Sequence, residues 1–201
     1  MVIIQSKIAL VGDGTVGKTS LVHSFTGKMS FLEAYKMTIG VNIVVHTTER
    51  GNGTKINLCI WDLGGQERFN VVRPQFYKGS QLIVYVYDLT NKESFDNLAN
   101  WLNEVHKSIA VSSYKGIVVG NKVDLDEYRV VDLENARDFS EIKGFQYIET
   151  SAKDGTGTQE LIDMLTENVL AKNSIRNGKH STPNIVKEIG IVPELSLTSF
   201  F

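Results

Sequence analysis

Three short apolar runs constrain the fold of this chain more than any other feature: Ile8–Val11, Leu82–Tyr87 and Ile117–Val119. Each run contains β-branched or aromatic residues and is too short for an ordinary helix. Because their hydrophobicity is continuous rather than alternating, we expect strands that are buried on both faces, as in a parallel sheet covered by helices.

Two other segments alternate between apolar and polar side chains. Residues 41–45 place an apolar side chain at every second position, and residues 56–60 do the same. The connection Arg50-Gly51-Asn52-Gly53 between them is typical of a turn. The two segments therefore predict an antiparallel hairpin with one face wetter than the rest of the sheet.

Apolar residues at helical spacing fall between these strands. Segment 95–109 carries them at alternating steps of three and four, and segments 133–143 and 161–169 are further candidates. Thr90 and Glu93 are placed as a capping box at the start of the first helix. Strands that alternate with helices predict an α/β domain, in which ligands bind at the carboxyl ends of the strands.

Composition excludes several functional classes. The 201 residues include 21 Lys and Arg against 23 Asp and Glu, for a net charge of −2, so nothing favours sequence-independent binding of nucleic acid. Cys59 is the single cysteine, which excludes an internal disulfide framework. Apolar stretches are too short to span a bilayer, and the first residues lack the pattern of a signal peptide. We therefore expect a cytoplasmic chain.

A glycine-rich segment directly after the first apolar run predicts a phosphate site. Gly12–Thr19 fits the pattern G-x-x-x-x-G-K-[ST] and lies between a predicted strand and a predicted helix. Glycine lets successive backbone N–H groups point at an anion, and the helix adds the positive end of its dipole. Lys18 supplies a charge for the outer phosphates, and the Thr19 hydroxyl is a ligand that suits Mg²⁺.

Three further motifs follow predicted strands. Asp62-Leu63-Gly64-Gly65 ends the second alternating strand and is typical of an aspartate near the metal of a nucleotide site. Asn121-Lys122-Val123-Asp124 follows the third apolar run, and Ser151-Ala152-Lys153 follows a short strand expected at 146–148. Four motifs in this order, each at a strand end, are difficult to obtain by chance.

On these motifs the chain resembles a small GTPase of the Ras superfamily over about residues 6 to 171, and it is most similar to the Rab branch. The supporting runs are Thr38–Val41, Trp61–Asp62, Gly65–Phe69, Phe76–Gly79 and Val86–Asp88. The resemblance implies a three-layer P-loop G-domain with five helices, in which a six-stranded, mostly parallel sheet has one antiparallel strand and helices cover both faces.

The boundaries of this domain are also predicted. The chain becomes polar after about Lys172, although apolar residues return further on. We therefore expect a G-domain at residues 1–171 and a C-terminal tail at residues 172–201.

The resemblance implies how guanine is held. Asp124 would accept hydrogen bonds from the N1–H and 2-amino groups of guanine, which adenine does not offer. Asn121 would brace the base and its loop, the Lys122 stem would cover one face of the ring, and the Ala152 N–H would bind the guanine oxygen. Phe31 would pack either against the base or in the core. The nucleotide-binding set comprises Asp13, Gly14, Thr15, Val16, Gly17, Lys18, Thr19, Ser20, Phe31, Tyr35, Thr38, Gly65, Asn121, Lys122, Asp124, Ser151, Ala152 and Lys153.

A metal site and a switch follow from the same resemblance. Thr19, Thr38 and Asp62 would hold Mg²⁺. The N–H groups of Thr38 and Gly65 would meet the γ-phosphate of GTP, and their release on hydrolysis to GDP would relax two loops.

Hydrolysis is assigned to two residues. Gln66 would orient the attacking water, and Lys18 would neutralise charge on the phosphates. Segment 29–40 contains no arginine, so we expect slow hydrolysis until an activating protein supplies one.

Two departures from the Rab pattern affect the functional interpretation. Leu63-Gly64 stands where Rab-like chains carry Thr-Ala, and the chain ends in Leu197–Phe201 without a prenylation cysteine. The predicted function is a molecular switch in trafficking or signalling that slowly hydrolyses GTP. The alternative is a GTP-binding scaffold without useful hydrolysis, which Leu63-Gly64 favours, whereas Asn121–Asp124 disfavours a P-loop kinase or ATPase.

Partners and location follow from this function. We expect a monomer whose switch regions contact effectors, an exchange factor and an activating protein, with no nucleic acid among its partners. The chain would be cytoplasmic or peripheral at a membrane, without prenyl-dependent attachment.

Overall fold

The computed structural model describes residues 2–26, 40–51, 53–66 and 70–177. Its contacts divide the chain into two units, Met1–Val169 and Leu170–Phe201. The second unit is described only where residues 170–177 continue a helix. The tail expected at residues 172–201 lies mostly outside the described residues, so the boundary at 172 stays a prediction.

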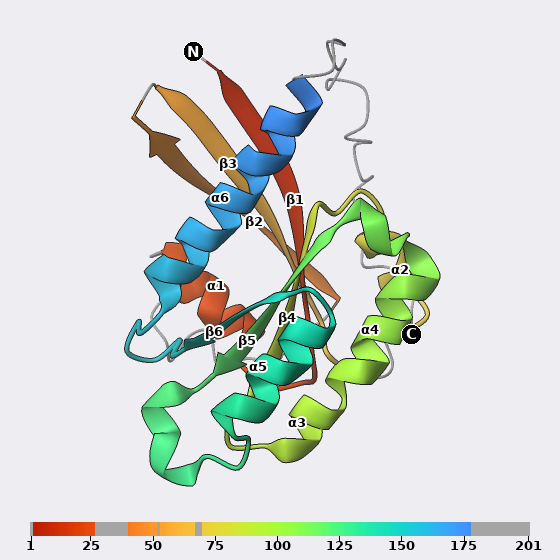
Figure 1. Ribbon diagram of the computed structural model, residues 1–201, viewed down its shortest axis with the longest axis vertical. Coiled ribbons are helices and arrows are strands. Elements are labelled where there is room, and N and C mark those ends of the chain that lie inside the picture. Colours follow the sequence, from red (N-terminus) through yellow and green to blue (C-terminus); the bar gives the residue numbers. More distant parts are fainter. Residues whose placement is uncertain (1, 27–39, 52, 67–69, 178–201) are drawn as a thin grey trace, which may run out of the picture. The chain divides into compact units, whose positions relative to one another are not determined.

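Six strands form one sheet in the order β2-β3-β1-β4-β5-β6 (Figure 1). The strands are β1 (Ile3–Val11), β2 (Val41–Arg50), β3 (Thr54–Leu63), β4 (Leu82–Asp88), β5 (Lys115–Asn121) and β6 (Gln146–Thr150). β2 pairs with β3 in the antiparallel sense, and all other pairs among the described residues are parallel. This confirms a mostly parallel sheet with one antiparallel strand.

Helices connect the strands. They are α1 (Lys18–Thr26), α2 (Arg73–Tyr77), α3 (Lys92–Asp96), α4 (Leu98–Ser108), α5 (Leu133–Ile142) and α6 (Thr158–Asn177), with 3₁₀ helices η2 (Val111–Ser113) and η3 (Val123–Tyr128). Figure 1 shows α2, α3, α4 and α5 on one face of the sheet, and α1 and the first part of α6 on the other. None of the helices in the described ranges is long and apolar enough to cross a membrane.

The strand β4 shows why the predicted strands read as unbroken apolar runs. All seven of its residues are buried. Tyr85 and Tyr87 belong to a core cluster that also contains Leu102 of α4, whereas Val84 and Val86 alternate with them and are equally buried. Because successive side chains of a strand point to opposite faces, a strand covered on both sides is apolar up to its end, where Asp88 is the first polar residue of β4.

Two details near α3 differ from the prediction. Thr90 is not the N-cap: the Asn91 side chain accepts a hydrogen bond from the Ser94 N–H at 3.3 Å, while the Thr90 hydroxyl donates to Asp88 at 2.8 Å. The apolar stripe predicted as one helix is divided into α3 and α4 at Asn97. The backbone of Asn97 is still helical, with φ −69° and ψ −12°, so the apolar stripe keeps its face.

Candidate functional site

The register of the sheet brings the four sequence motifs to one edge. Leu10, near the end of β1, lies opposite Asp62 of β3 and Val84 of β4. Asn121, the last residue of β5, lies opposite Thr150 at the end of β6. The loops that follow β1, β3, β5 and β6 therefore begin side by side, as expected for a ligand site at the carboxyl ends of parallel strands.

The loop between β1 and α1 has a shape that depends on glycine. Gly12 has φ +140°, and a Cβ there would lie 2.1 Å from the carbonyl oxygen of Val86. Gly17 has φ +96°, and its Cβ would lie 2.3 Å from Nδ2 of Asn121. Both positions exclude any side chain, so the backbone of this loop is held close to the ends of β4 and β5. At Gly14, by contrast, a Cβ would meet nothing within 4 Å among the described residues.

Thr15 adopts an unusual backbone conformation in this loop. Its φ is +66°, in the left-handed region that β-branched residues rarely enter, and its side chain is exposed. Strain of this kind concentrates at ligand-binding loops.

Lys18 is the first residue of α1, directly after the loop, and Ser20 lies in the same first turn. The Lys18 side chain is buried, and its Nζ donates to the carbonyl oxygens of Gly12 at 2.8 Å and Asp13 at 2.7 Å. Burial lowers the pKa of Lys18 to about 8, although Asp62 and Asp13 oppose this shift. A buried ammonium whose hydrogen bonds go to two neutral carbonyls is well suited to an anionic ligand.

Thr19 and Asp62 form the candidate metal site. The Thr19 hydroxyl donates to Oδ2 of Asp62 at 2.5 Å, and the aspartate is fully buried. In the described ranges no group of three or more His, Cys, Asp or Glu residues is arranged to hold a metal ion. One carboxylate and one hydroxyl fit Mg²⁺, which prefers oxygen and takes much of its shell from phosphates and water.

Gly65 and Gln66 follow β3 and lie against the phosphate loop. A Cβ at Gly65 would lie 2.5 Å from the carbonyl oxygen of Gly12, so glycine is required for this approach. Leu63, one of the departures from the Rab pattern, is buried in the core, and the N–H of Gly64 donates to the Gly40 carbonyl at 2.8 Å. Despite this departure from the Rab pattern, the backbone that leads into Gly65 is therefore held in place by the Leu63 side chain and the Gly64 N–H.

A largely buried polar cluster lies beside this segment, formed by Arg73, Tyr77, Trp101 and the half-buried Glu104; we call it the Arg73 cluster. Sequence reasoning missed it, because its members are scattered over α2 and α4, and each fits an ordinary helical pattern. Asp13 is joined to it, since Trp101 Nε1 donates to the Asp13 carboxylate at 2.7 Å.

Asn121 connects the phosphate loop to the loops after β5 and β6. Its Nδ2 donates to the carbonyl oxygen of Val16 at 2.8 Å. Its Oδ1 accepts from the Thr150 hydroxyl at 3.1 Å and from the Ala152 N–H at 3.2 Å. Asn121 therefore ties the phosphate loop to the loop after β6, and the Ala152 N–H would have to share or exchange this bond to reach guanine.

The remaining residues of the predicted base site also come together. The Ser151 hydroxyl donates to Oδ1 of Asp124 at 2.7 Å, and Lys153 Nζ lies 3.7 Å from Oδ2. Lys122 has a left-handed backbone, with φ +73°, and its Nζ lies 2.6 Å from a carboxylate oxygen of Asp88. The Ser151 hydroxyl therefore fixes one oxygen of Asp124, and the Lys153 ammonium lies beside the other.

Phe31, Tyr35 and Thr38 lie outside the described residues. Their predicted contacts with base, phosphate and metal remain predictions.

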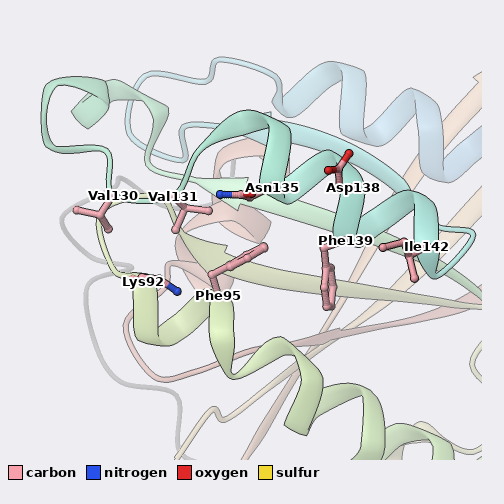
Figure 2. Close-up of a pocket in the computed structure, with 8 residues that line it drawn as sticks. All are labelled: Lys92, Phe95, Val130, Val131, Asn135, Asp138, Phe139 and Ile142. Carbon is pink, nitrogen blue, oxygen red and sulfur yellow. The ribbon is translucent and has the colours of Figure 1, made fainter.

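A separate apolar pocket of about 380 Å³ lies between α3 and α5 (Figure 2). Phe95 and Phe139 line it on facing helices, with Val130, Val131 and Ile142 at its rim. Its described lining includes no residue of the predicted nucleotide site.

The fold and the glycine-rich loop are typical of P-loop nucleoside triphosphatases. A model of the Ras family matches residues 7–171 of the chain. The chain is 37% identical to the Ras-related protein RABD2c of Arabidopsis thaliana over 181 residues, which cover 90% of this chain and 88% of that protein. It is 34% identical to the Ras-related protein Rab-8 of Diplobatis ommata over 188 residues, which cover 94% and 88% of the two chains. It is also 36% identical to the Ras-related protein Rab-13 of Mesocricetus auratus over 179 residues, which cover 89% of this chain and 87% of that protein.

The chain therefore belongs to the Ras family. It is a Rab-like GTP-binding switch protein of the kind that acts in intracellular trafficking, and it is a GTPase. Proteins of this kind bind guanine nucleotides with Mg²⁺, and they bind regulators and effectors.

Proposed function

We propose that the edge of the sheet formed by the four motifs binds GTP or GDP with Mg²⁺ and hydrolyses GTP slowly. Backbone N–H groups of the loop at residues 13–18, the positive end of α1 and the Lys18 ammonium would together bind the phosphates. The close approaches at Gly12 and Gly17 support this role, because they hold the backbone of the loop against the ends of β4 and β5.

Asn121 is the observation that carries the proposal. Its amide bonds both to Val16 in the phosphate loop and to Ala152 in the loop after β6. Two loops far apart in the sequence are thereby held at a fixed spacing. A ligand with phosphates at one end and a base at the other requires such a spacing.

Asp124 would select the base. The carboxylate accepts one hydrogen bond from Ser151, which fixes its orientation and leaves lone pairs for the N1–H and 2-amino groups of guanine. Adenine offers neither donor at these positions, so the partly buried carboxylate would lose its partners at a cost of about 1–3 kcal/mol.

Thr19 and Asp62 are the described residues that would hold Mg²⁺, and Thr38 is the third predicted ligand. When bound, the ion neutralises charge on the phosphate oxygens. The 2.5 Å bond between the Thr19 hydroxyl and the Asp62 carboxylate supports a preformed pair of oxygens for it.

Gln66 would orient the attacking water, since its amide can accept a hydrogen bond from water and donate one to a phosphate oxygen. Lys18 would remain protonated against the phosphates. Positioning and charge neutralisation suffice for slow turnover, and an arginine supplied by an activating protein would raise the rate by about 10³–10⁵-fold.

Loss of the γ-phosphate would remove the contacts of Gly65 and Thr38, and partners would detect the change in these two segments. We propose a monomer that meets an exchange factor, an activating protein and effectors there. Its location would be cytoplasmic or peripheral at a membrane.

The direct test is to purify the full chain, denature it, and separate the released nucleotides by chromatography before and after incubation. We expect guanine nucleotides in near-stoichiometric amount, with GTP converted to GDP over time. The Lys18→Gln variant serves as the control and should release little nucleotide. Recovery of adenine nucleotides, or an empty wild-type protein, would overturn the proposal.

A further inference from the structure

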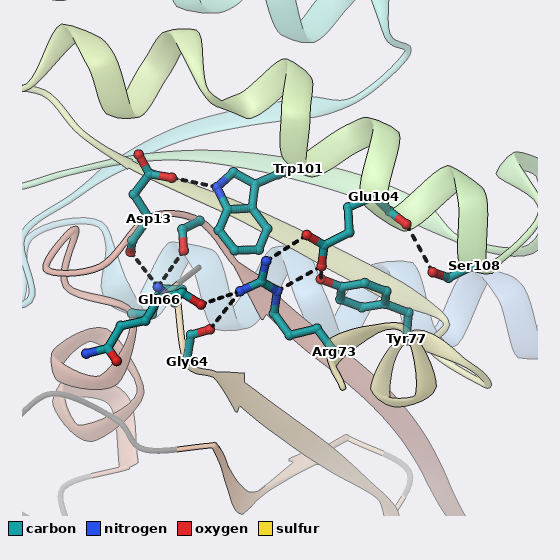
Figure 3. A network of polar contacts seen from close by, with 10 residues as sticks. Asp13, Gly64, Gln66, Arg73, Tyr77, Trp101, Glu104 and Ser108 are labelled. Atoms are coloured by element: carbon teal, nitrogen blue, oxygen red, sulfur yellow. Dashed lines mark hydrogen bonds and ion pairs between the residues drawn. The ribbon is translucent and has the colours of Figure 1, made fainter. Parts of the chain in front are cut away.

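The Arg73 guanidinium lies between the segment that follows β3 and the helix α4 (Figure 3). Its Nη1 donates to the carbonyl oxygen of Gln66 at 2.8 Å and, more weakly, to that of Gly64 at 3.4 Å. These two carbonyls flank Gly65 on either side. One side chain therefore holds the backbone around the residue whose N–H would meet the γ-phosphate.

The opposite side of this segment contacts the phosphate loop. Added at Gly65, a Cβ would lie 2.5 Å from the Gly12 oxygen and 2.6 Å from the Asp13 oxygen. The backbone at 64–66 is thus enclosed between the phosphate loop and Arg73. Figure 3 shows the Gln66 carbonyl turned toward the guanidinium, while the Gln66 side-chain amide points away from it.

Arg73 is itself firmly held. Its Nε and Nη2 donate to the two carboxylate oxygens of Glu104 at 2.8 and 2.7 Å, and its Cζ lies 4.4 Å from the ring centroid of Trp101. Tyr77 also donates to Glu104, at 2.5 Å. Burial alone would raise the pKa of Glu104, but the bonds from Arg73 and Tyr77 outweigh it and lower that pKa. The pair therefore stays ionised at neutral pH.

This geometry argues for a role through position rather than through charge. Arg73 is 5% exposed and its guanidinium is neutralised by a bidentate carboxylate, so it is not available to contact a phosphate. Lysine could not replace it, because only a planar fork can bond to carboxylate and carbonyls at once.

We propose that Arg73 is a positioning residue for GTP hydrolysis, which fixes the Gly64–Gln66 backbone so that Gln66 addresses the attacking water. The proposal rests on the hydrolytic role of Gln66 given above. The helix α4 then influences the rate of GTP hydrolysis, because its residues Glu104 and Trp101 hold Arg73 in place.

The test compares Arg73→Gln with wild type by single-turnover hydrolysis of preloaded GTP and by the dissociation rate of GDP. Misplacing a reacting group by about 1 Å costs up to roughly 100-fold, so we expect hydrolysis to slow by about 10- to 100-fold. GDP dissociation should remain unchanged, because the contacts of Arg73 within the described ranges go to residues 64, 66, 101 and 104 and not to the base loops. Ser108→Ala is the matched control: it removes the bond from the Ser108 hydroxyl to the Glu104 backbone carbonyl on α4 and leaves every side chain of the Arg73 cluster in place, so hydrolysis should be unchanged.

A double variant separates positioning from stability. Because Arg73 acts through Gln66, Arg73→Gln should have no further effect on hydrolysis in a Gln66→Leu background. An equal loss in both backgrounds, or wild-type hydrolysis in Arg73→Gln, would overturn the inference. If Gln66→Leu itself hydrolyses GTP normally, the proposed function fails instead.

Glu104→Gln tests the same inference should Arg73→Gln not yield folded protein. It keeps the guanidinium and weakens its anchor, so hydrolysis should slow in the same direction. An unchanged rate in that variant would overturn the role of Arg73.

Discussion

Nδ2 of Asn121 donates to the carbonyl oxygen of Val16 at 2.8 Å, which ties the end of β5 to the phosphate loop. Through Oδ1 the same amide accepts from Thr150 and Ala152 beyond β6. This side chain is 1% exposed, so water cannot replace it. Nucleotide affinity and protein stability should therefore depend on Asn121 together.

Asn121→Ala removes three hydrogen bonds and leaves their partners buried. Each such bond contributes about 0.5–1.5 kcal/mol, so the free energy of unfolding should fall by roughly 2–4 kcal/mol. GDP should also dissociate faster, because the two loops lose their fixed spacing. Urea unfolding and the release of fluorescent GDP measure the two effects. Asn135→Ala, at an exposed position of α5, is the control and should change neither.

Asp124→Asn tests the choice of base. The substituted amide presents an N–H group to two donors of guanine, so GTP affinity should fall by roughly 100-fold, or about 3 kcal/mol. Preference for guanine over hypoxanthine nucleotides, which lack the 2-amino group, should disappear at the same time. Competition titration of the two nucleotides measures both quantities.

The control for this variant is Asp126→Asn, two residues further along η3. Asp126 bonds to Arg129 on the surface, and its side chain is 65% exposed. If both variants discriminate between the bases as wild type does, Asp124 does not read the 2-amino group.

Much of this architecture was predictable because it depends on local rules. A strand buried on both faces must be apolar throughout, and the run at 82–87 predicted β4 for that reason. The alternation at 41–45 and 56–60 likewise predicted the antiparallel pair of β2 and β3. The four motifs could also be placed at one edge of the sheet from the sequence, because each follows a strand and parallel strands end at the same edge.

Contacts between side chains distant in the sequence were not predictable in this way. Arg73 and Glu104 each satisfy an ordinary helical pattern, and nothing local indicates that they meet across α2 and α4. Thr90 fails as a cap for a related reason, because Asp88 at the end of β4 competes for its hydroxyl. Tertiary partners decided both cases.

Nucleotide affinity should depend on pH through Lys18. Burial lowers its pKa to about 8 from 10.5, with Asp62 and Asp13 opposing the shift. Above about pH 8 the nucleotide-free protein loses this proton and must take it up again to bind phosphates. Affinity for GDP should therefore fall by up to about tenfold per pH unit above that value. Titration with GDP between pH 7 and 9 measures the slope, and Lys18→Gln should bind weakly with a flatter dependence.

Protein stability should change in the opposite direction. The unfolded chain keeps Lys18 protonated up to its ordinary pKa of 10.5, so between about pH 8 and 10.5 the unfolded state binds more protons than the folded state. The free energy of unfolding of the nucleotide-free protein should consequently rise with pH in this window, relative to Lys18→Gln. A difference between the two proteins that stays constant across the window would contradict a depressed pKa.

Thr15→Gly should stabilise the protein, although it removes a side chain. The φ of +66° costs a β-branched residue about 1–3 kcal/mol, and glycine adopts it freely. Greater freedom of glycine in the unfolded chain offsets about 0.5–1 kcal/mol, so we expect a net gain of roughly 1 kcal/mol in the free energy of unfolding. GDP affinity should be retained, because the backbone N–H of residue 15 remains.

Urea unfolding of nucleotide-free protein measures the gain, with Thr47→Gly in the extended strand β2 as the control that should lose stability. Equal losses in both variants would mean that Thr15 occupies its left-handed conformation without strain.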